Sequence, residues 1–425
     1  MIAYNAAGTL AKCLDSIRPF VQYIAVGVDE RTTDKTAKVA RQHGADLVFP
    51  IKVSDWHECE HHGKILAQHF AKARNEVFSR LPKDVDFWFW ADSDDTLVGG
   101  ERLNQALSSV PDDVNCVWLP YRYSTVNNGA GVTTEFDRER FLRTNCEWVW
   151  THRVHETVAP VGVPVRPIRL SGIHIWHQEG AHKTESSAER NHRLIEIELE
   201  EEPDNTRSVF YMANGLFAQR RWAEAIEWYA RVGQNPACNQ YERWQSYVYL
   251  SMAAEQIGDA DGATQAAMLA IDVLPQYKEP YYRLAAMALV TGDPAKCIYW
   301  TGIADGKAEP PHFVFKNPIE YSFNSRVALA QAYYQQGEVH KALQAAQAAY
   351  AASPTESLKT DIIHYQELIQ GWERANAFVG MCEMLDDTEI ARLYELLPLS
   401  VRQFGRVRDV AVPVILRLRE SRLAA

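Results

Sequence analysis

The stretch "DFWFWADSDDTL" (Asp86–Leu97) joins an aromatic run to a group of acidic residues. Residues 87–91 carry no charge and fit a strand that is buried on both faces. Asp92, Asp94 and Asp95 then crowd three carboxylates into four positions, where the like charges repel one another. Two interpretations follow: a solvated turn that caps a helix, or a site where a positive group binds.

The surrounding sequence alternates short β-rich runs with helical patterns. The runs predict strands at residues 23–28, 45–51, 86–91 and 116–123. Helical patterns occupy residues 7–17 and 32–44. This alternation predicts an α/β domain with a Rossmann-like, mostly parallel sheet. Because ligands of such sheets bind beyond the carboxyl ends of the strands, the acidic group lies at an expected binding position.

A different pattern begins near residue 189, where similar helical phrases recur. They start at residues 220, 258, 292 and 337, close to the period of about 34 residues that is typical of tetratricopeptide repeats. A small residue follows each start by five positions, where two helices must approach closely. These residues are Ala225, Ala263, Cys297 and Ala342. The pattern predicts an all-α repeat domain, with an irregular helical bundle as the alternative.

We therefore predict three parts: an α/β domain at residues 1–188, helical repeats at 189–370 and a C-terminal helical segment of unknown role at 371–425. A chain of 425 residues is longer than the chain that one hydrophobic core usually supports, which favours more than one domain. Its net charge of −11 disfavours tight nucleic-acid binding. No apolar run has membrane-spanning length, and seven scattered cysteines without a CxxC pair predict a reducing, cytoplasmic location.

Six short segments in the first 180 residues resemble the motifs of family-2-type, GT-A-fold nucleotide-sugar glycosyltransferases, in the subgroup fused to tetratricopeptide repeats. The segments are "IAYNAAGTLAKCLDSI", "VDERTTDKT", "FAKARNEVF", "WADSDDTL", "RVHETV" and "IWHQEG". One of them departs from the family: the loop "DERTTDK" has Glu30, Arg31 and Lys35 where Asp, Gly and Gly are usual. Its local backbone and nucleotide contacts are therefore expected to differ.

The resemblance implies a divalent-cation site at the acidic group. Asp94 would be the main ligand of Mn²⁺ or Mg²⁺, with Asp92 near the metal and the ribose. His177 would be the third ligand, and His174 is held in reserve. A histidine ligand suits Mn²⁺ better than Mg²⁺. The structural alternative is that each histidine is hydrogen-bonded in a core or loop.

The resemblance also implies a binding site for a nucleoside diphosphate sugar, with a UDP-sugar favoured. Asp29 would accept a hydrogen bond from the base, and Tyr4 would stack on it. Arg74 would pair with the base or the diphosphate. Ser93, inside the Asp-x-Asp motif, and Asp92 complete the donor-binding residues. Ordinary structural roles, such as a core ring for Tyr4 and a surface charge for Arg74, are the alternatives.

For the chemistry, the resemblance implies an inverting transfer of a hexose or pentose to an unidentified acceptor. Glu156 is the candidate general base, and His155 is the alternative, or only orients its neighbour. The repeats would hold an acceptor or protein partner, or pair two copies of the chain. Two other functions stay open: a non-catalytic repeat scaffold with a degenerate transferase domain, and transfer to modified nucleic-acid bases.

The stretch "DWHECEHHGK" (residues 55–64) invites a zinc interpretation. No spacing within it resembles a tetrahedral site, so a loop over the donor pocket is the favoured interpretation.

Overall fold

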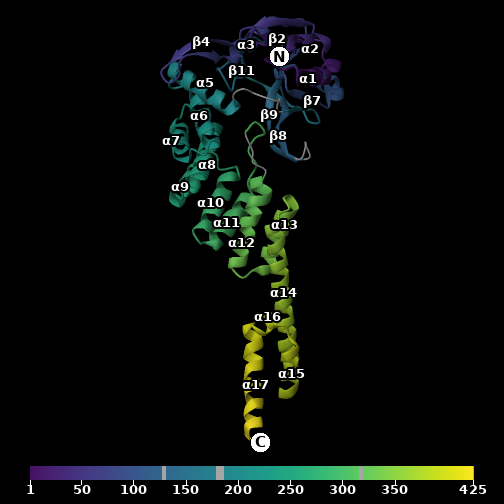
Figure 1. The fold of residues 1–425 in the computed structure, drawn as a ribbon, viewed down its shortest axis with the longest axis vertical. Helices are drawn as coiled ribbons and strands as arrows, with labels where there is room; N and C mark the ends of the chain where they lie inside the picture. The colour runs from purple at the N-terminus through teal and green to yellow at the C-terminus, as the bar shows by residue number, and fades with distance from the viewer. Residues whose placement is uncertain (127–130, 179–185, 315–318, 425) are drawn as a thin grey trace. The chain divides into compact units, whose positions relative to one another are not determined.

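The computed structural model describes residues 1–126, 131–178, 186–314 and 319–424 (Figure 1). The chain divides into two compact units. The first comprises Met1–Pro280 and Lys307–Pro318, and the second comprises Tyr281–Gly306 and Ile319–Ala425. The domain boundaries predicted at residues 188 and 370 stay predictions.

The first unit opens with a small parallel sheet. Its order is β1 (Ile2–Ala3), β2 (Ala25–Asp29) and β3 (Leu47–Ile51). Helices α1 (Leu10–Ile17) and α2 (Thr36–Gln42) connect these strands. Every residue of β2 is buried, as expected for the central strand of a sheet covered on both faces. This part matches the parallel α/β pattern predicted from the sequence.

A second, six-stranded sheet carries the aromatic run. Its path is β6 (Phe87–Phe89), β9 (Gly131–Arg143), β8 (Cys116–Val126), β13 (His174–His177) and β7 (Asp95–Val98), and β12 (Pro167–Arg169) also pairs with β8. The β6/β9, β8/β9 and β13/β7 pairs are antiparallel, whereas β8 pairs in parallel with β12 and β13.

The prediction of one mostly parallel, GT-A-type sheet is therefore wrong for this region. The long β8–β9 hairpin provides β8 with an antiparallel neighbour directly, without the helical crossover that a parallel pair requires. Strand β7 was also missed by the sequence analysis. It begins at Asp95, inside the acidic group, which is consequently a turn between β6 and β7 rather than the cap of a helix.

The strand-rich part of this unit, as far as it is described, also contains two hairpins and two further α-helices. They are β4 (Ser54–Cys59) with β5 (Gly63–Gln68), β10 (Trp148–Thr151) with β11 (Thr157–Pro160), α3 (Phe70–Phe78) and α4 (Leu103–Ser108). The loop predicted at residues 55–64 is thus mainly the antiparallel hairpin β4–β5.

Five helices follow in the same unit: α5 (Ser187–Glu201), α6 (Thr206–Ala218), α7 (Trp222–Gln234), α8 (Gln240–Gln256) and α9 (Ala260–Val273). Helix α5 begins with a capping box between Ser186 and Glu189. Leu194 and Ile197 of α5 share a core with Ala67 of β5 and Met212 of α6, so this helix joins the hairpin β4–β5 to the repeats.

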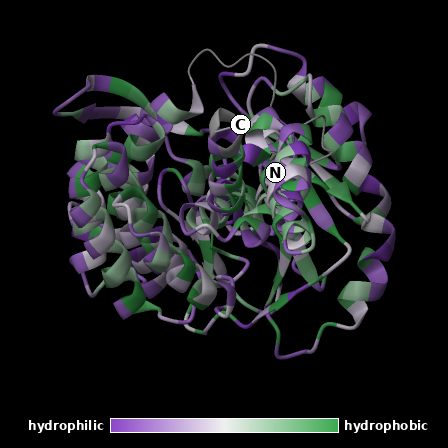
Figure 2. Cartoon of the chain, turned by 90° about the horizontal axis from the view of Figure 1, so that it is seen from below, coloured by the Kyte–Doolittle hydropathy of each residue, from purple (hydrophilic) through white to green (hydrophobic). Residues whose placement is uncertain are grey.

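The second unit is helical. It contains all but the first two residues of α10 (Glu279–Val290), followed by α11 (Pro294–Asp305), a π-helical turn (Glu320–Asn324), α12 (Ser325–Gln335), α13 (Val339–Ala352), α14 (Glu356–Cys382), α15 (Asp387–Leu396), α16 (Leu399–Arg402) and α17 (Gly405–Ala424). Among the described residues, no helix combines the length and the apolar character needed to cross a membrane. Figure 2 shows apolar and polar residues side by side along the helices of the chain.

The helical pairs have the small-residue contacts of tetratricopeptide-like repeats. The four small residues predicted at these contacts are fully buried: Ala225, Ala263, Cys297 and Ala342. The turns before three of these helices use Gly258, Gly292 and Gly337, each with φ near 80°, which favours glycine. Arg220 takes the same left-handed conformation in the first pair, with φ 59°. The repeat prediction is confirmed.

The segment that follows α11 belongs to the first unit and packs within it. The backbone N–H of Asp137 in β9 donates to the carbonyl of His312 at 2.8 Å. The ring of Phe313 contacts Trp118 of β8 and Tyr241 of α8, with ring centroids 5.5 and 4.9 Å apart. This segment therefore ties the second sheet to the repeat helix α8.

The buried small residues provide a test of the repeat packing. Ala342→Leu adds three carbons where no space exists, so it should lower the free energy of unfolding by about 1–3 kcal/mol. Ala348→Leu on the exposed side of the same helix is the control. Thermal unfolding followed by circular dichroism measures both variants. Equal melting temperatures would contradict the packing described here.

Candidate functional site at the acidic turn

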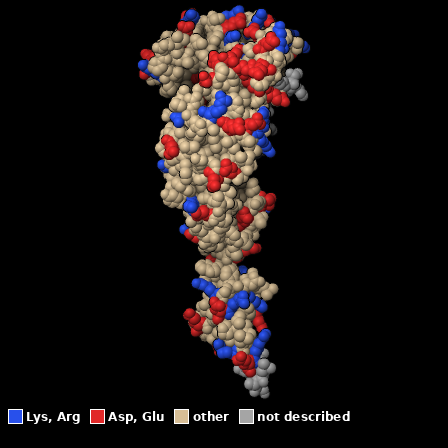
Figure 3. All heavy atoms as spheres, turned by 90° about the vertical axis from the view of Figure 1, so that its left-hand side faces the viewer, with Lys and Arg blue, Asp and Glu red and all other residues tan. Residues whose placement is uncertain are grey.

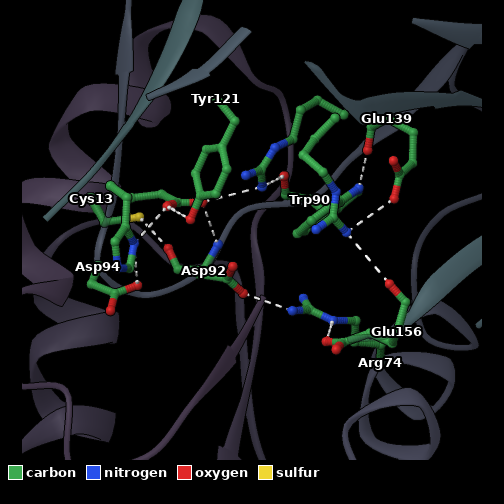
Figure 4. A network of polar contacts seen from close by, with 12 residues as sticks. Cys13, Arg74, Trp90, Asp92, Asp94, Tyr121, Glu139 and Glu156 are labelled. Atoms are coloured by element: carbon green, nitrogen blue, oxygen red, sulfur yellow. Dashed lines mark hydrogen bonds and ion pairs between the residues drawn. The ribbon is translucent and has the colours of Figure 1, made fainter. Parts of the chain in front are cut away.

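The acidic turn is held by its own hydrogen bonds and by α1. The backbone N–H of Asp95 donates to the Asp92 carbonyl at 3.1 Å, and the Asp92 N–H donates to Oδ2 of Asp95 at 3.0 Å. The Cys13 thiol donates to the same Asp92 carbonyl at 3.3 Å. Ser93 lies half-buried at the tip of the turn. These bonds direct the side chains of Asp92 and Asp94 to different surroundings (Figure 4).

Asp94, Asp95 and His177 form one cluster. Nδ1 of His177 lies 3.6 Å from Oδ1 of Asp94 and 3.5 Å from Oδ1 of Asp95. One ligand atom from each residue lies within 4.8 Å of the others, which is close enough to share a metal ion. The pairing of β13 with β7 produces this cluster, because it sets His177 directly opposite Asp95. Part of the predicted metal set is thus brought together.

The imidazole of His177 is positioned by aromatic rings. It stacks on Tyr123 at 5.2 Å with nearly parallel planes. Burial lowers its pKa, but the carboxylates of Asp95 and Asp94 outweigh burial and raise the pKa above the ordinary value. The ring nitrogen therefore faces an environment that favours positive charge.

His174 lies elsewhere. Side chains alternate along a strand, so His174, three residues before His177, points to the opposite face of β13. Its Nε2 lies 3.1 Å from Nη1 of Arg122.

A buried ion pair with Arg140 holds the carboxylate of Asp95 in the interior. Nη1 of Arg140 lies 3.2 Å from Oδ2 of Asp95, and both side chains are fully buried. The hydroxyl of Tyr121 donates to Oδ1 of Asp95 at 3.1 Å. Burial and the Asp95 charge together raise the pKa of Tyr121 far above its ordinary value, so the phenol stays a donor. Asp95 is thus fixed in the interior, whereas Asp94 keeps 19% of its side chain exposed.

Asp92 belongs to a different group, centred on Arg74 of α3. Nη2 of Arg74 donates to Oδ1 of Asp92 at 2.7 Å, and Nε donates to Oε1 of Glu156 at 2.6 Å. The guanidinium packs against the rings of Trp90 and Trp150, 4.7 and 4.9 Å from their centroids. Although burial alone would raise it, the pKa of Asp92 is held well below its usual range by this guanidinium. Asp92 is thus directed at Arg74 rather than at the cluster with Asp94.

The two candidate bases therefore have structural partners. Glu156 accepts from Arg74 and is only 12% exposed. His155 has φ 53° and stacks on Tyr211 of α6, with ring centroids 3.8 Å apart. Burial, followed by the charges of Arg207 and other nearby arginines, lowers the pKa of His155 to about 3, so its ring is neutral near pH 7. The predicted catalytic roles of Glu156 and His155 stay predictions.

The residues predicted for the nucleotide form a second group at the small parallel sheet. Arg31 contacts both oxygens of Asp29, with Nε 3.0 Å from Oδ1 and Nη2 2.5 Å from Oδ2. The same guanidinium lies 5.2 Å from the ring of Tyr4, which is 51% exposed. The predicted nucleotide contacts of Tyr4 and Asp29 stay predictions. Arg31 was noted from the sequence only as a departure from a motif.

Sequence reasoning missed the basic residues beneath the turn. Arg138 and Arg140 of β9 both lie against the ring of Trp90, at 5.1 and 3.9 Å. Their spacing of two residues places them on the same face of a strand, which is a signal that the sequence "DRERF" contains. These arginines are positive groups that offset the crowded carboxylates. On the face drawn in Figure 3, acidic side chains gather in several groups, in keeping with the net charge of −11.

Comparison with known proteins gives no family. No family model matches the chain, and no curated protein matches it. Among solved structures, the MamA protein is similar at 18% identity and TM-score 0.31, covering 39% of this chain and 81% of MamA. Cut9–Hcn1 of the APC/C is similar at 12% identity and TM-score 0.37, and the match covers 54% of this chain and 40% of that chain. TTC0263, a TPR protein in Thermus thermophilus, is similar at 19% identity and TM-score 0.30, and the match covers 42% of this chain and 90% of TTC0263.

The resemblance to family-2-type glycosyltransferases is corrected by these findings. The structural neighbours are TPR proteins, no glycosyltransferase is among them, and the second sheet is mixed rather than mostly parallel. Local structure accounts for several of the matched residues. Asp34 accepts from the backbone of Ala7 and Thr36, and Asn75 exchanges two hydrogen bonds with the backbone of Trp150. Such residues recur in loops and caps of many folds, so short motifs built from them misled the family assignment.

The buried imidazole of His155 predicts acid sensitivity. The unfolded chain binds a proton at this site below pH 6.5, whereas the folded chain resists protonation down to about pH 3. The free energy of unfolding therefore contains the full contribution of this site above pH 6.5, and it falls by about 2–3 kcal/mol as the pH is lowered to 4.5. His155→Gln removes the titrating group, so the stability gap between wild type and variant should shrink over this range. His340→Gln, an exposed change, is the control. A gap that stays constant from pH 7.5 to 4.5 in urea unfolding would contradict the prediction.

Proposed function

We propose that the chain is a scaffold whose helical repeats bind an extended segment of a protein partner. Stacked helix pairs present extended surfaces that suit this task. The observation that carries the proposal is an exposed polar–aromatic group on two successive repeats of the second unit. It consists of the exposed Tyr334 on α12 and the exposed His364 on α14, with the buried ring of Tyr365 on α14 packed against Tyr334.

The geometry of this group suits peptide recognition. The hydroxyl of Tyr334 lies 3.1 Å from Nε2 of His364, and its ring lies 5.1 Å from that of Tyr365. Tyr334 is 41% exposed, so an apolar ring and a polar edge are offered together. Tyrosine supplies a large contact area at low conformational cost, which is why it is enriched at interfaces. By contrast, Tyr281 and Tyr282 of α10 are 6% exposed and serve packing.

The test selects peptides from a random library against the full chain and measures their affinity by calorimetry. Tyr334→Ala and His364→Ala should each weaken a selected peptide by about tenfold, as expected for an interface anchor. Tyr299→Ala, on the second helix of another pair and 61% exposed, is the matched control and should leave the affinity unchanged. If no peptide is enriched, or if all three variants bind alike, the proposal fails.

A second candidate function is catalytic: a divalent-cation-dependent transfer from a nucleoside diphosphate sugar. The cluster of Asp94, Asp95 and His177 favours it, because two carboxylates and an imidazole suit Mn²⁺. The fit is supported by Nδ1 of His177, a buried atom without a hydrogen bond within the described part of the chain. A bound ion would neutralise diphosphate charge. Asp94 and His177 would hold it, while Arg140 and Tyr121 would keep Asp95 in place.

Cation binding can be measured without any assumption about activity. Mn²⁺ titrated into the full chain, followed by electron paramagnetic resonance of free Mn²⁺, should report one site. Asp94→Asn should weaken this site by at least about tenfold, because it removes an anionic ligand atom while keeping the shape. His174→Gln, on the opposite face of β13, is the control. Equal Mn²⁺ binding by wild type and Asp94→Asn would remove the support for this candidate.

A further inference from the structure

Helix α5 carries four glutamates in its last six residues. They are Glu196, Glu198, Glu200 and Glu201, and no lysine or arginine lies among them. Like charges four residues apart, such as Glu196 and Glu200, destabilise a helix. The helix dipole also disfavours negative charge at the C-terminal end, where these carboxylates lie. The end of α5 is therefore stabilised only if positive groups from other elements face it.

Histidines supply most of these positive groups. Among the described residues, five imidazoles face the four carboxylates, with nitrogen–oxygen distances between 2.7 and 3.5 Å. Three belong to the β4–β5 hairpin, which lies beside α5 (Figure 1), one follows β10, and one lies on α5 itself. They are His57, His61, His62, His152 and His192. The hairpin is thus joined to the helix mainly through imidazole–carboxylate pairs.

The other charged groups near these pairs keep their charge between pH 6 and 8. Nε of Arg153 lies 3.0 Å from Oε2 of Glu201 and is a permanent cation. Burial lowers the pKa of His69 to about 4, so its ring stays neutral in this range. The remaining groups are Glu60 in the hairpin turn, Lys72 of α3, Arg193 of α5, and Arg221 and Glu224 at the start of α7. The charge that changes near neutral pH therefore comes from the five histidines.

The pair of His61 and Glu200 shows the direction of this effect. The hydrogen bond to Glu200 raises the pKa of His61 above its ordinary value. Although loss of solvent would raise it, the pKa of Glu200 is lowered by the same hydrogen bond. A histidine with a raised pKa contributes its full stabilisation below the ordinary value of about 6.5 and loses it as the pH rises past the raised value. The charged contact is thus strongest in mild acid.

Apolar packing adds little to the contact. Within residues 54–68 of the hairpin, only Cys59 and Ala67 are buried, and both are small. They share a core with Leu194 and Ile197 of α5. Because the buried apolar area of the hairpin is small, the charges facing α5 decide whether it stays packed on the helix.

We propose that the contact between the β4–β5 hairpin and α5 is a pH-sensitive device: it is closed near pH 6, where the imidazoles are protonated, and it opens locally as the pH rises toward 8. Deprotonation leaves the glutamates of α5 facing one another without the compensating positive charge. The device is separate from the cluster of Asp94 and His177, and it does not depend on the proposed function.

The test measures hydrogen exchange of the backbone amides of residues 54–68 in the full chain at pH 6 and pH 8, corrected for the intrinsic exchange rate. Protection of these amides should fall by about tenfold between pH 6 and 8, the summed effect of several partly exposed ion pairs. Helix α8, which contains no histidine, belongs to the same unit and should keep its protection. Equal protection of the hairpin at both pH values would overturn the proposal.

Two sets of variants separate the charge effect from a folding defect. The triple variant His57→Gln/His61→Gln/His62→Gln should have a weakly protected hairpin at both pH values. Glu196→Gln/Glu200→Gln relieves the repulsion, so its hairpin should be better protected than wild type at pH 8. Amides of α8 show whether each variant is folded. The proposal is also overturned if the Glu196→Gln/Glu200→Gln hairpin is no better protected than wild type at pH 8.

The matched control is His43→Gln. His43 forms an imidazole–carboxylate pair with Asp15 in the same unit, with 2.8 Å between Nδ1 and Oδ1, but it lies away from α5. This variant should retain the tenfold fall in hairpin protection. A loss of the fall in His43→Gln, or its persistence in the folded triple variant, would contradict the assignment to the hairpin histidines.

Discussion

The guanidinium of Arg74 connects three segments that lie far apart in the sequence. It donates from α3 to Asp92 in the acidic turn and to Glu156 in the segment between β10 and β11. The rings of Trp90 and Trp150, which contact each other edge to face, both pack against it. A buried cation between two carboxylates is strongly destabilised when either partner is lost, so the three segments must assemble together. The position of the acidic turn, and of the cluster with His177, depends on this contact.

The pairing of carboxylates with arginines also explains why the three carboxylates of the acidic turn can lie so close together. Asp92 faces Arg74, Asp95 faces Arg140, and Asp94 keeps part of its surface in water. Arginines thus relieve the repulsion at Asp92 and Asp95. Asp94 contributes to the one cluster of the described residues in which carboxylates and a histidine are close enough to share a metal ion. The structure therefore combines both interpretations of the turn: it is a structural turn, and it also carries a candidate cation site.

The contact between the strand-rich part and the first repeat helices depends on a second set of histidines. His155 stacks on Tyr211, while histidines of the β4–β5 hairpin face glutamates of α5. Sequence analysis interpreted this hairpin as a loop, because its histidines and acids obscured the alternation of a strand. Their partners lie about 140 residues away on α5. Pairing over such a separation leaves no local signal, so only the folded chain reveals it.

Local pattern alone determined the repeats and several strands of this protein. The small residues at the helix contacts, the glycine turns and the β-rich runs at residues 23–28 and 45–51 are properties of neighbours along the chain. The tertiary structure decided the mixed sheet, the partners of Asp92 and Asp95 and the convergence of His177 on Asp94. Each of these depends on strand pairing or on buried charge, which are set by residues distant in sequence. Short motifs report local turn chemistry, and for this reason they did not identify the family.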